Sequence, residues 1–229
     1  MVKGPKPGDD SAGTTEAGDV EDCDGSKSAC TKKTPAAVPR LQNPPRSPGG
    51  VVTFRALHEA DFPQVRDWLS RPHVAEWWGR DSGGIAGIGS AAPTLAAVEA
   101  WYRPLLAATS KTQNYIVLHD GVAIGLVQTY RPRDYPDYAA CIGIDEGAGI
   151  DLFIGELDHV GRGIGPLVIS AFARDVVFGP QGMEACVASP DPRNLRSLRA
   201  FEKAGFERRQ TFTVPGTRNR ETLVVLRRR

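Results

Sequence analysis

The chain has 229 residues, with 28 Lys and Arg against 27 Asp and Glu, so its formal net charge is only +1 at pH 7. This balance creates no field that would attract nucleic acid, and no apolar run is long enough to predict a membrane span or a secretion signal. The four cysteines lack the spacing of metal ligands, so we expect no metal site and a protein of the reducing cytoplasm.

The first fifty residues differ in composition from the rest of the chain. They contain no aromatic residue, only four large aliphatic residues and seven of the 18 prolines. A segment with so little apolar surface cannot build a core, so we predict that residues 1–50 form a disordered extension. All Trp, Tyr and Phe residues lie in residues 51–229, which are predicted to form a single domain.

The first half of this domain is predicted to contain a strand, helices and a hairpin. Residues 51–57 alternate as in a strand, and residues 62–70 show the apolar spacing of a helix. We expect a short helical or looped segment over 74–79, a mobile loop over 79–93, and a helix over 94–108 with Thr94 as its N-cap. Asp120-Gly121 lies between predicted strands at 114–119 and 122–130, which is a strong hairpin signal.

The second half is predicted to alternate strands and helices. Residues 131–149 are rich in Pro, Tyr, Asp and Gly, so we expect a long loop with a strand around 139–144. The further expected elements are strands at 150–154 and 183–188, helices at 166–178 and 194–204, and a hairpin of 206–214 with 221–227. This order predicts an α/β fold with a mixed central sheet flanked by helices.

The most informative segment is Gly155-Glu-Leu-Asp-His-Val-Gly-Arg-Gly-Ile-Gly165, which joins the strand at 150–154 to the next helix. A glycine-rich turn at the start of a helix exposes backbone N–H groups that the helix cannot satisfy, and the positive helix end favours an anion. We therefore predict a phosphate site, although its spacing fits neither a P-loop nor the dinucleotide fingerprint well. The alternative for each single glycine is an ordinary turn or helix cap.

Three segments in this order resemble the GNAT acetyltransferase superfamily. They are the strand at 150–154, the glycine loop at 160–165, and Asn194-Leu-Arg-Ser-Leu-Arg-Ala-Phe-Glu-Lys-Ala-Gly-Phe206. The resemblance implies a GNAT-type mixed central sheet flanked by helices, and the transfer of an acetyl group from acetyl-CoA to an amine.

More narrowly, residues 51–229 resemble the aminoglycoside 6'-N-acetyltransferases. The shared marks include Val74-Ala-Glu-Trp-Trp-Gly79 and Gly149-Ile-Asp-Leu-Phe-Ile-Gly155. This resemblance implies acetylation of an aminoglycoside, at its 6'-amine, and hence antibiotic resistance. Siderophore-type lysine acetyltransferases share much of the same frame, so another amine such as hydroxylysine is the alternative acceptor.

The resemblance also implies which residues hold the donor. The glycine loop would bind the pyrophosphate, the edge of the strand at 150–154 would pair with the pantetheine amides, and Asn194 would fix the cofactor near the thioester. The expected donor-binding residues are Phe153, Ile154, Val160, Gly161, Arg162, Gly163, Ile164, Gly165 and Asn194.

Asp151 is the candidate catalytic residue. It interrupts an apolar strand, so its side chain either points away from the core or carries a desolvation cost. In the enzymes that the chain resembles, the matching aspartate lies beside the reacting amine as a base or an anchor. The alternative is an exposed residue of an alternating strand.

A polycationic acceptor is expected to need an acidic site. The candidate acceptor-binding residues are Trp77, Trp78, Asp137, Asp145, Glu146 and Asp191. The resembling enzymes have an aspartate where this chain has Ser189, and Asp191 is the possible replacement. The alternatives are a solvated acidic loop and a Trp pair of which one member packs in the core.

Phe201 departs from the pattern of the superfamily, in which many members have a tyrosine whose hydroxyl protonates the leaving thiolate. Phenylalanine has no proton to donate, so the acid would be water, another side chain or the thiolate itself. The departure also leaves a non-catalytic acyl-CoA-binding module as a third hypothesis. We expect a monomer or a homodimer.

Overall fold

The computed structural model describes residues 49–78, 93–214 and 216–228. Residues 1–48 of the extension predicted over 1–50 lie outside the described residues. Residues 79–92 of the loop predicted over 79–93 also lie outside them. Within the described ranges, no helix is long and apolar enough to cross a membrane.

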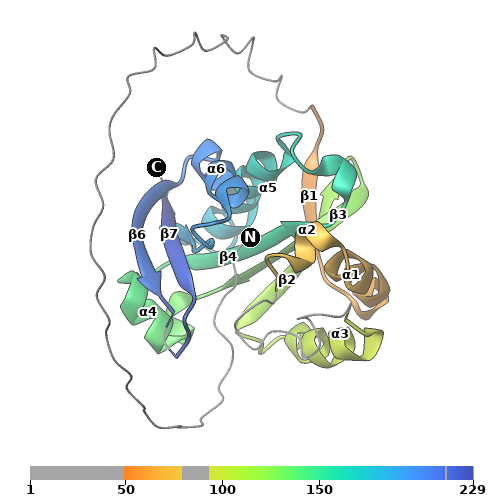
Figure 1. Ribbon diagram of the computed structural model, residues 1–229, viewed down its shortest axis with the longest axis horizontal. Coiled ribbons are helices and arrows are strands. Elements are labelled where there is room, and N and C mark those ends of the chain that lie inside the picture. The colour runs from red at the N-terminus through yellow and green to blue at the C-terminus, as the bar shows by residue number, and fades with distance from the viewer. Residues whose placement is uncertain (1–48, 79–92, 215, 229) are drawn as a thin grey trace, which may run out of the picture. The chain divides into compact units, whose positions relative to one another are not determined.

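In the described part of the chain, seven strands form one mixed sheet in the order β1-β2-β3-β4-β5-β7-β6 (Figure 1). Adjacent strands are antiparallel except β4 and β5, which are parallel. The strands are β1 (Val52–Ala56), β2 (Thr112–His119), β3 (Val122–Tyr130), β4 (Ala148–Ile154), β5 (Ala185–Ala188), β6 (Glu207–Thr213) and β7 (Arg220–Arg227). Every strand predicted outside 131–149 is present, with ends shifted by a few residues.

Helices cover both faces of this sheet. Because neighbouring residues of a strand point to opposite faces, Tyr115 packs against Phe172 of α5, while Ile116 joins the cluster that contains Trp68 of α1. Figure 1 shows α5 and α6 together, apart from α1, α2 and α3. The bounds of these helices are α1 (Phe62–Leu69), α2 (Pro72–Ala75), α3 (Leu95–Tyr102), α5 (Ile164–Phe172) and α6 (Leu195–Lys203).

Short helical turns extend several of these elements. The helix predicted over 94–108 ends as an α-helix at Tyr102, and a 3-10 helix with Pro104 in its first turn continues it. The helix predicted over 166–178 begins earlier, at Ile164, and its second half is a π-helix. The additional turns are η1 (Glu59–Asp61), η2 (Arg103–Leu106), η3 (Pro132–Asp134), η4 (Leu157–His159) and η5 (Ala173–Phe178).

The prediction of a strand around 139–144 is wrong, because residues 136–142 form helix α4 (Pro136–Ile142). Pro136 occupies the first helical position, which suits its fixed φ. Tyr138, Ala139 and Ile142 are buried at helical spacing, and Gly143 ends the helix in a left-handed conformation with φ of 65°. Pro136 and Gly143 therefore mark the two ends of a short helix within the segment that was predicted to be a long loop.

The structure confirms two local predictions, the hairpin turn at Asp120-Gly121 and the N-cap at Thr94. Asp120 and Gly121 have φ of 51° and 79°, which is the pair of positive angles that a two-residue hairpin turn requires. At the start of α3, the Thr94 hydroxyl accepts a hydrogen bond of 3.1 Å from the backbone N–H of Ala97. The prediction that Thr94 is the N-cap of this helix is therefore confirmed.

Thr94→Ala is expected to destabilise the domain by about 1 kcal/mol, because one N–H group at the start of α3 loses its acceptor. For a domain of this size that loss corresponds to a melting temperature roughly 2–4 °C lower, measured by thermal unfolding. Thr94→Ser keeps the hydroxyl and is expected to melt within about 1 °C of the unaltered protein. Equal melting temperatures for the Ala and Ser variants would contradict the capping role.

Candidate active site

The two parallel strands in the middle of the sheet separate after a short contact. Within the described residues, β4 and β5 pair only at Ala148 with Cys186 and at Gly149 with Val187. From Ile150 onward, the edge of β4 that faces β5 therefore has no strand partner. Backbone N–H and C=O groups along such an edge can hydrogen-bond an extended ligand that carries amides.

The turn after β4 directs backbone N–H groups into the same region. Gly161 and Gly163 have φ of 78° and 83°, a left-handed conformation that favours glycine. Gly163 is the N-cap of α5, and no side chain caps this end of the helix. The N–H groups of the first turn of α5 are thus available to an anion, and the helix dipole favours one.

Glu156 anchors the chain between β4 and this turn. Its carboxylate accepts hydrogen bonds from the Trp68 indole N–H at 2.8 Å and from Arg71 at 2.7 Å. The Arg71 guanidinium holds the pKa of Glu156 below its ordinary value. The Trp68 ring lies so close to Gly155 that a Cβ atom there would overlap it. These contacts fix α1 and α2 against the end of β4.

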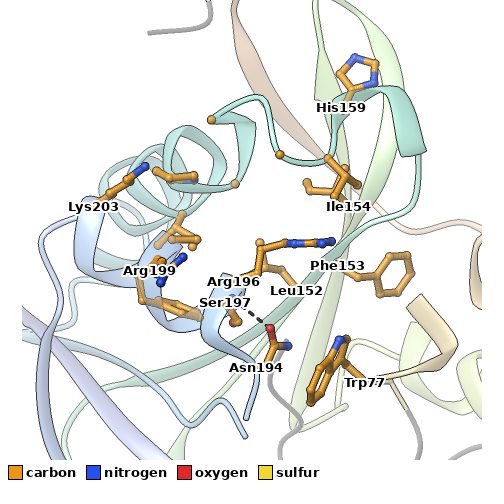
Figure 2. A pocket seen from close by; sticks show the side chains of 18 of the residues that line it. Trp77, Leu152, Phe153, Ile154, His159, Asn194, Arg196, Ser197, Arg199 and Lys203 are labelled. Carbon is orange, nitrogen blue, oxygen red and sulfur yellow. Dashed lines mark hydrogen bonds between the residues drawn. The ribbon is translucent and has the colours of Figure 1, made fainter. Parts of the chain in front are cut away.

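A pocket of about 410 Å³ lies between this turn, β4 and α6 (Figure 2). It contains most of the residues that the sequence predicted for donor binding. Those that line it are Phe153, Ile154, Val160, Gly161, Gly163, Gly165 and Asn194. Arg162 is not among its lining residues, and Ile164 is buried in the core cluster under α5. Asn194 also caps α6, because its side chain accepts a hydrogen bond of 3.0 Å from the N–H of Ser197.

Three cations of α6 line the pocket and were not predicted. Arg196, Arg199 and Lys203 are spaced three and four residues apart, so they lie on one side of the helix. None of the three forms an ion pair with another described residue, whereas the neighbouring Glu202 is paired with Arg208. Figure 2 shows the Arg196 side chain reaching from α6 into the pocket. The helical spacing of these residues in the sequence was a signal that could have revealed them.

The candidate catalytic residue, Asp151, is completely buried. Its carboxylate accepts a hydrogen bond of 2.7 Å from the side-chain amide of Gln128, which faces it from β3. The alternative of an exposed strand residue is therefore wrong. Burying a carboxylate is costly even when it is hydrogen-bonded, which is a cost that proteins commonly bear at functional sites.

Tyrosines surround the same part of the sheet. The Tyr138 hydroxyl of α4 lies 2.7 Å from Ser189 Oγ, and the Tyr130 ring packs against the Tyr138 ring. Burial raises the pKa of Tyr130 well above its ordinary value, and the negative charge of Asp151 raises it further. These phenols stay protonated at neutral pH and can donate hydrogen bonds.

The residues predicted for acceptor binding do not form one cluster. Trp77 lines the pocket near Asn194, whereas Trp78 is buried and packs edge-on against Phe153 at 4.9 Å. Asp137 and Asp145 are exposed. Glu146 forms an ion pair with Arg133, and Asp191 forms one with Arg193.

The parallel strands β4 and β5 separate beside a glycine turn, and a pocket lies between that turn, β4 and α6. This is the architecture of an acyl-CoA-dependent GNAT transferase. The family model of the acetyltransferase (GNAT) domain matches residues 58–214, and the chain belongs to this family. The predicted fold class is thereby confirmed. The chain is an acetyltransferase by family.

Within this family, the chain is similar to aminoglycoside N(6')-acetyltransferases. The chain is 34% identical over 165 residues to aminoglycoside N(6')-acetyltransferase type 1 of Klebsiella pneumoniae, covering 72% of this chain and 78% of that protein. It is also similar to the solved structure of AAC(6')-Ib with ribostamycin and coenzyme A, at a TM-score of 0.63 and 31% identity, covering 77% and 93% of the two chains. A structure of AAC(6')-Ib with coenzyme A and kanamycin matches at a TM-score of 0.61 and 30% identity, covering 78% and 95%.

Proposed function

We propose that this protein transfers an acetyl group from acetyl-CoA to the 6'-amine of an aminoglycoside antibiotic, in the cytoplasm, and so confers resistance. The observation that carries the proposal is the buried Asp151 of β4, which is hydrogen-bonded to Gln128 of β3 and adjoins the residues of β4 that line the pocket. The similarity to aminoglycoside N(6')-acetyltransferases supports the choice of acceptor.

The residues of the pocket fit acetyl-CoA as the donor substrate. The left-handed glycines and the first turn of α5 supply N–H groups for the pyrophosphate, and the unpaired edge of β4 supplies partners for the pantetheine amides. The α6 cations match the negative charge of the phosphates. The donor contributes an acetyl group already activated as a thioester.

Asp151 is the proposed base for the acceptor amine. An ammonium group cannot attack a carbonyl until it loses a proton, and a carboxylate at this position both attracts the cation and can accept that proton. The Gln128 amide holds the carboxylate by donating to Oδ2. Gln128 is therefore a positioning residue that acts through Asp151.

The departing thiolate receives no proton from position 201. Phe201 is fully buried, packs against Phe206 with ring centroids 5.0 Å apart, and lines the pocket. We propose that water protonates the thiolate, or that it leaves unprotonated. A CoA thiol is acidic enough that a thiolate is a tolerable leaving group near neutral pH.

We propose Trp77 as a wall of the acceptor site, because it lines the pocket and lies near Asn194. For Trp78 the structure favours a packing role against Phe153. The carboxylates of Asp137, Asp145, Glu146 and Asp191 are proposed to attract a polycation at longer range rather than to bind it together.

The test is release of CoA thiol from acetyl-CoA in the presence of kanamycin, of N-hydroxylysine, or of no acceptor. The proposal expects a rate with kanamycin far above the rate without acceptor, and acetylation of its 6'-amine by mass spectrometry and NMR. A rate with N-hydroxylysine alone would favour an acyltransferase of siderophore synthesis. Binding of acetyl-CoA without turnover of any acceptor would indicate a non-catalytic acyl-CoA-binding module.

A further inference from the structure

A buried row of polar side chains crosses three neighbouring strands. Asn114 of β2 faces Gln128 of β3, and Gln128 faces Asp151 of β4, so all three point to the same face of the sheet. They are 6%, 9% and 0% exposed. The adjacent row on the same three strands and the same face is entirely apolar and belongs to the core under α1 and α3: Ile116, Leu126 and Phe153.

Asn114 is anomalous within this row. Gln128 donates to Asp151, but neither the Nδ2 nor the Oδ1 atom of Asn114 has a hydrogen-bond partner among the described residues. A buried amide without partners destabilises a fold, and an apolar residue of similar size would remove that cost. The apolar row beside it shows that this face of the sheet accommodates such residues. A buried, unsatisfied polar group requires an explanation, and a hydrogen-bond partner supplied by a bound ligand is one that also accounts for its place beside Gln128 and Asp151.

We propose that Asn114 is an acceptor-binding residue that selects polyhydroxylated amines, an inference that rests on the proposed function. Its amide offers one donor and one acceptor group, the combination that matches a hydroxyl group of a sugar ring. Asn114 and Asp151 are two strand spacings apart, about 10 Å. An acceptor with its reactive amine at Asp151 and ring hydroxyls further along can reach both. A simple alkyl amine gains nothing from Asn114.

The deciding experiment compares Asn114→Leu with the unaltered protein. Calorimetric binding of kanamycin to the CoA-bound protein is expected to weaken roughly tenfold, the cost of one lost hydrogen bond to a polar ligand. The KM for kanamycin should rise by a similar factor, whereas the KM for acetyl-CoA should stay within about twofold. The melting temperature should not fall, because the variant removes an unsatisfied buried amide. Gln113→Leu, an exposed neighbour on the opposite face of β2, is the matched control and should leave kanamycin binding unchanged.

The outcomes separate this inference from the proposed function. Absence of thiol release with kanamycin in the unaltered protein contradicts the proposed function before any variant is made. Kanamycin affinity within threefold of the unaltered protein in Asn114→Leu overturns the inference, as does an equal rise in both KM values. Failure of the unaltered protein to bind kanamycin overturns both. If Asn114→Leu does not fold, Asn114→Ala provides the same comparison with a smaller side chain.

Discussion

Asp151→Asn is expected to lower kcat/KM for an aminoglycoside by roughly a hundredfold or more, the usual scale for loss of a general base. The substitution keeps the size and shape of the side chain, and the Asn oxygen can still accept the hydrogen bond that Gln128 donates at 2.7 Å. It removes the negative charge that attracts the ammonium group and the site that takes its proton. Steady-state kinetics with kanamycin and acetyl-CoA measure the effect.

A control variant for Asp151→Asn tests whether the loss of turnover comes from the site of Asp151 or from the loss of one negative charge anywhere on the protein. Asp67→Asn makes the same change on the exposed surface of α1, where Asp67 pairs with Arg66, and is expected to leave turnover unchanged. Binding of CoA to the Asp151→Asn protein should equal that of the unaltered protein. If Asp151→Asn retained full turnover in a folded protein, Asp151 would be a structural residue and another base would be required.

Much of the site could be predicted because its signals are local in the sequence. Gly161 and Gly163 adopt left-handed conformations that favour glycine, and Asp120-Gly121 encodes its hairpin turn by itself. The helix after Asn194 shows its cap, its apolar face and its terminal Gly205 within a dozen residues. These elements also carry the resemblance to the family.

What sequence reasoning missed depends on strand register and on packing. The pairing of Gln128 with Asp151 requires the relative alignment of β3 and β4, which lie on either side of α4 in the chain. No local pattern fixes that alignment. The Trp77–Trp78 pair shows the same limit, because only tertiary packing decides that Trp78 lies against Phe153 while Trp77 lines the pocket.

Helix α4 was missed for a different reason. Its composition is typical of a loop, and its seven residues are too few for a clear amphipathic period. The helix is stabilised by burial of Tyr138 and Ile142 against Val187 and Leu223 rather than by its own propensity. Because Tyr138 also contacts Ser189, this unpredicted helix shapes the sheet face on which Asp151 lies.

The double variant Arg199→Gln and Lys203→Gln is expected to raise the KM for acetyl-CoA about thirtyfold and to leave the KM for the acceptor unchanged. Both cations line the pocket and form no ion pair with another described residue, so a bound phosphate would be their main anionic partner. Each contact with a phosphate at this exposed position contributes about 1 kcal/mol, and two such losses multiply to roughly thirtyfold.

The dependence of CoA affinity on ionic strength provides a second test of phosphate binding by Arg199 and Lys203. Salt screens charges at exposed sites, so the affinity of the unaltered protein for CoA should fall as salt increases, and the double variant should show a weaker dependence. The matched control is Lys111→Gln with Arg227→Gln, which removes two charges from exposed residues outside the pocket and should change neither quantity. If the α6 variant and this control bound CoA equally well at low salt, the cations of α6 would be surface charges, and the backbone N–H groups around Gly161 and Gly163 would have to hold the phosphates without them. A selective loss in the α6 variant would instead show that the donor is recognised from two sides, by the turn before α5 and by the exposed face of α6.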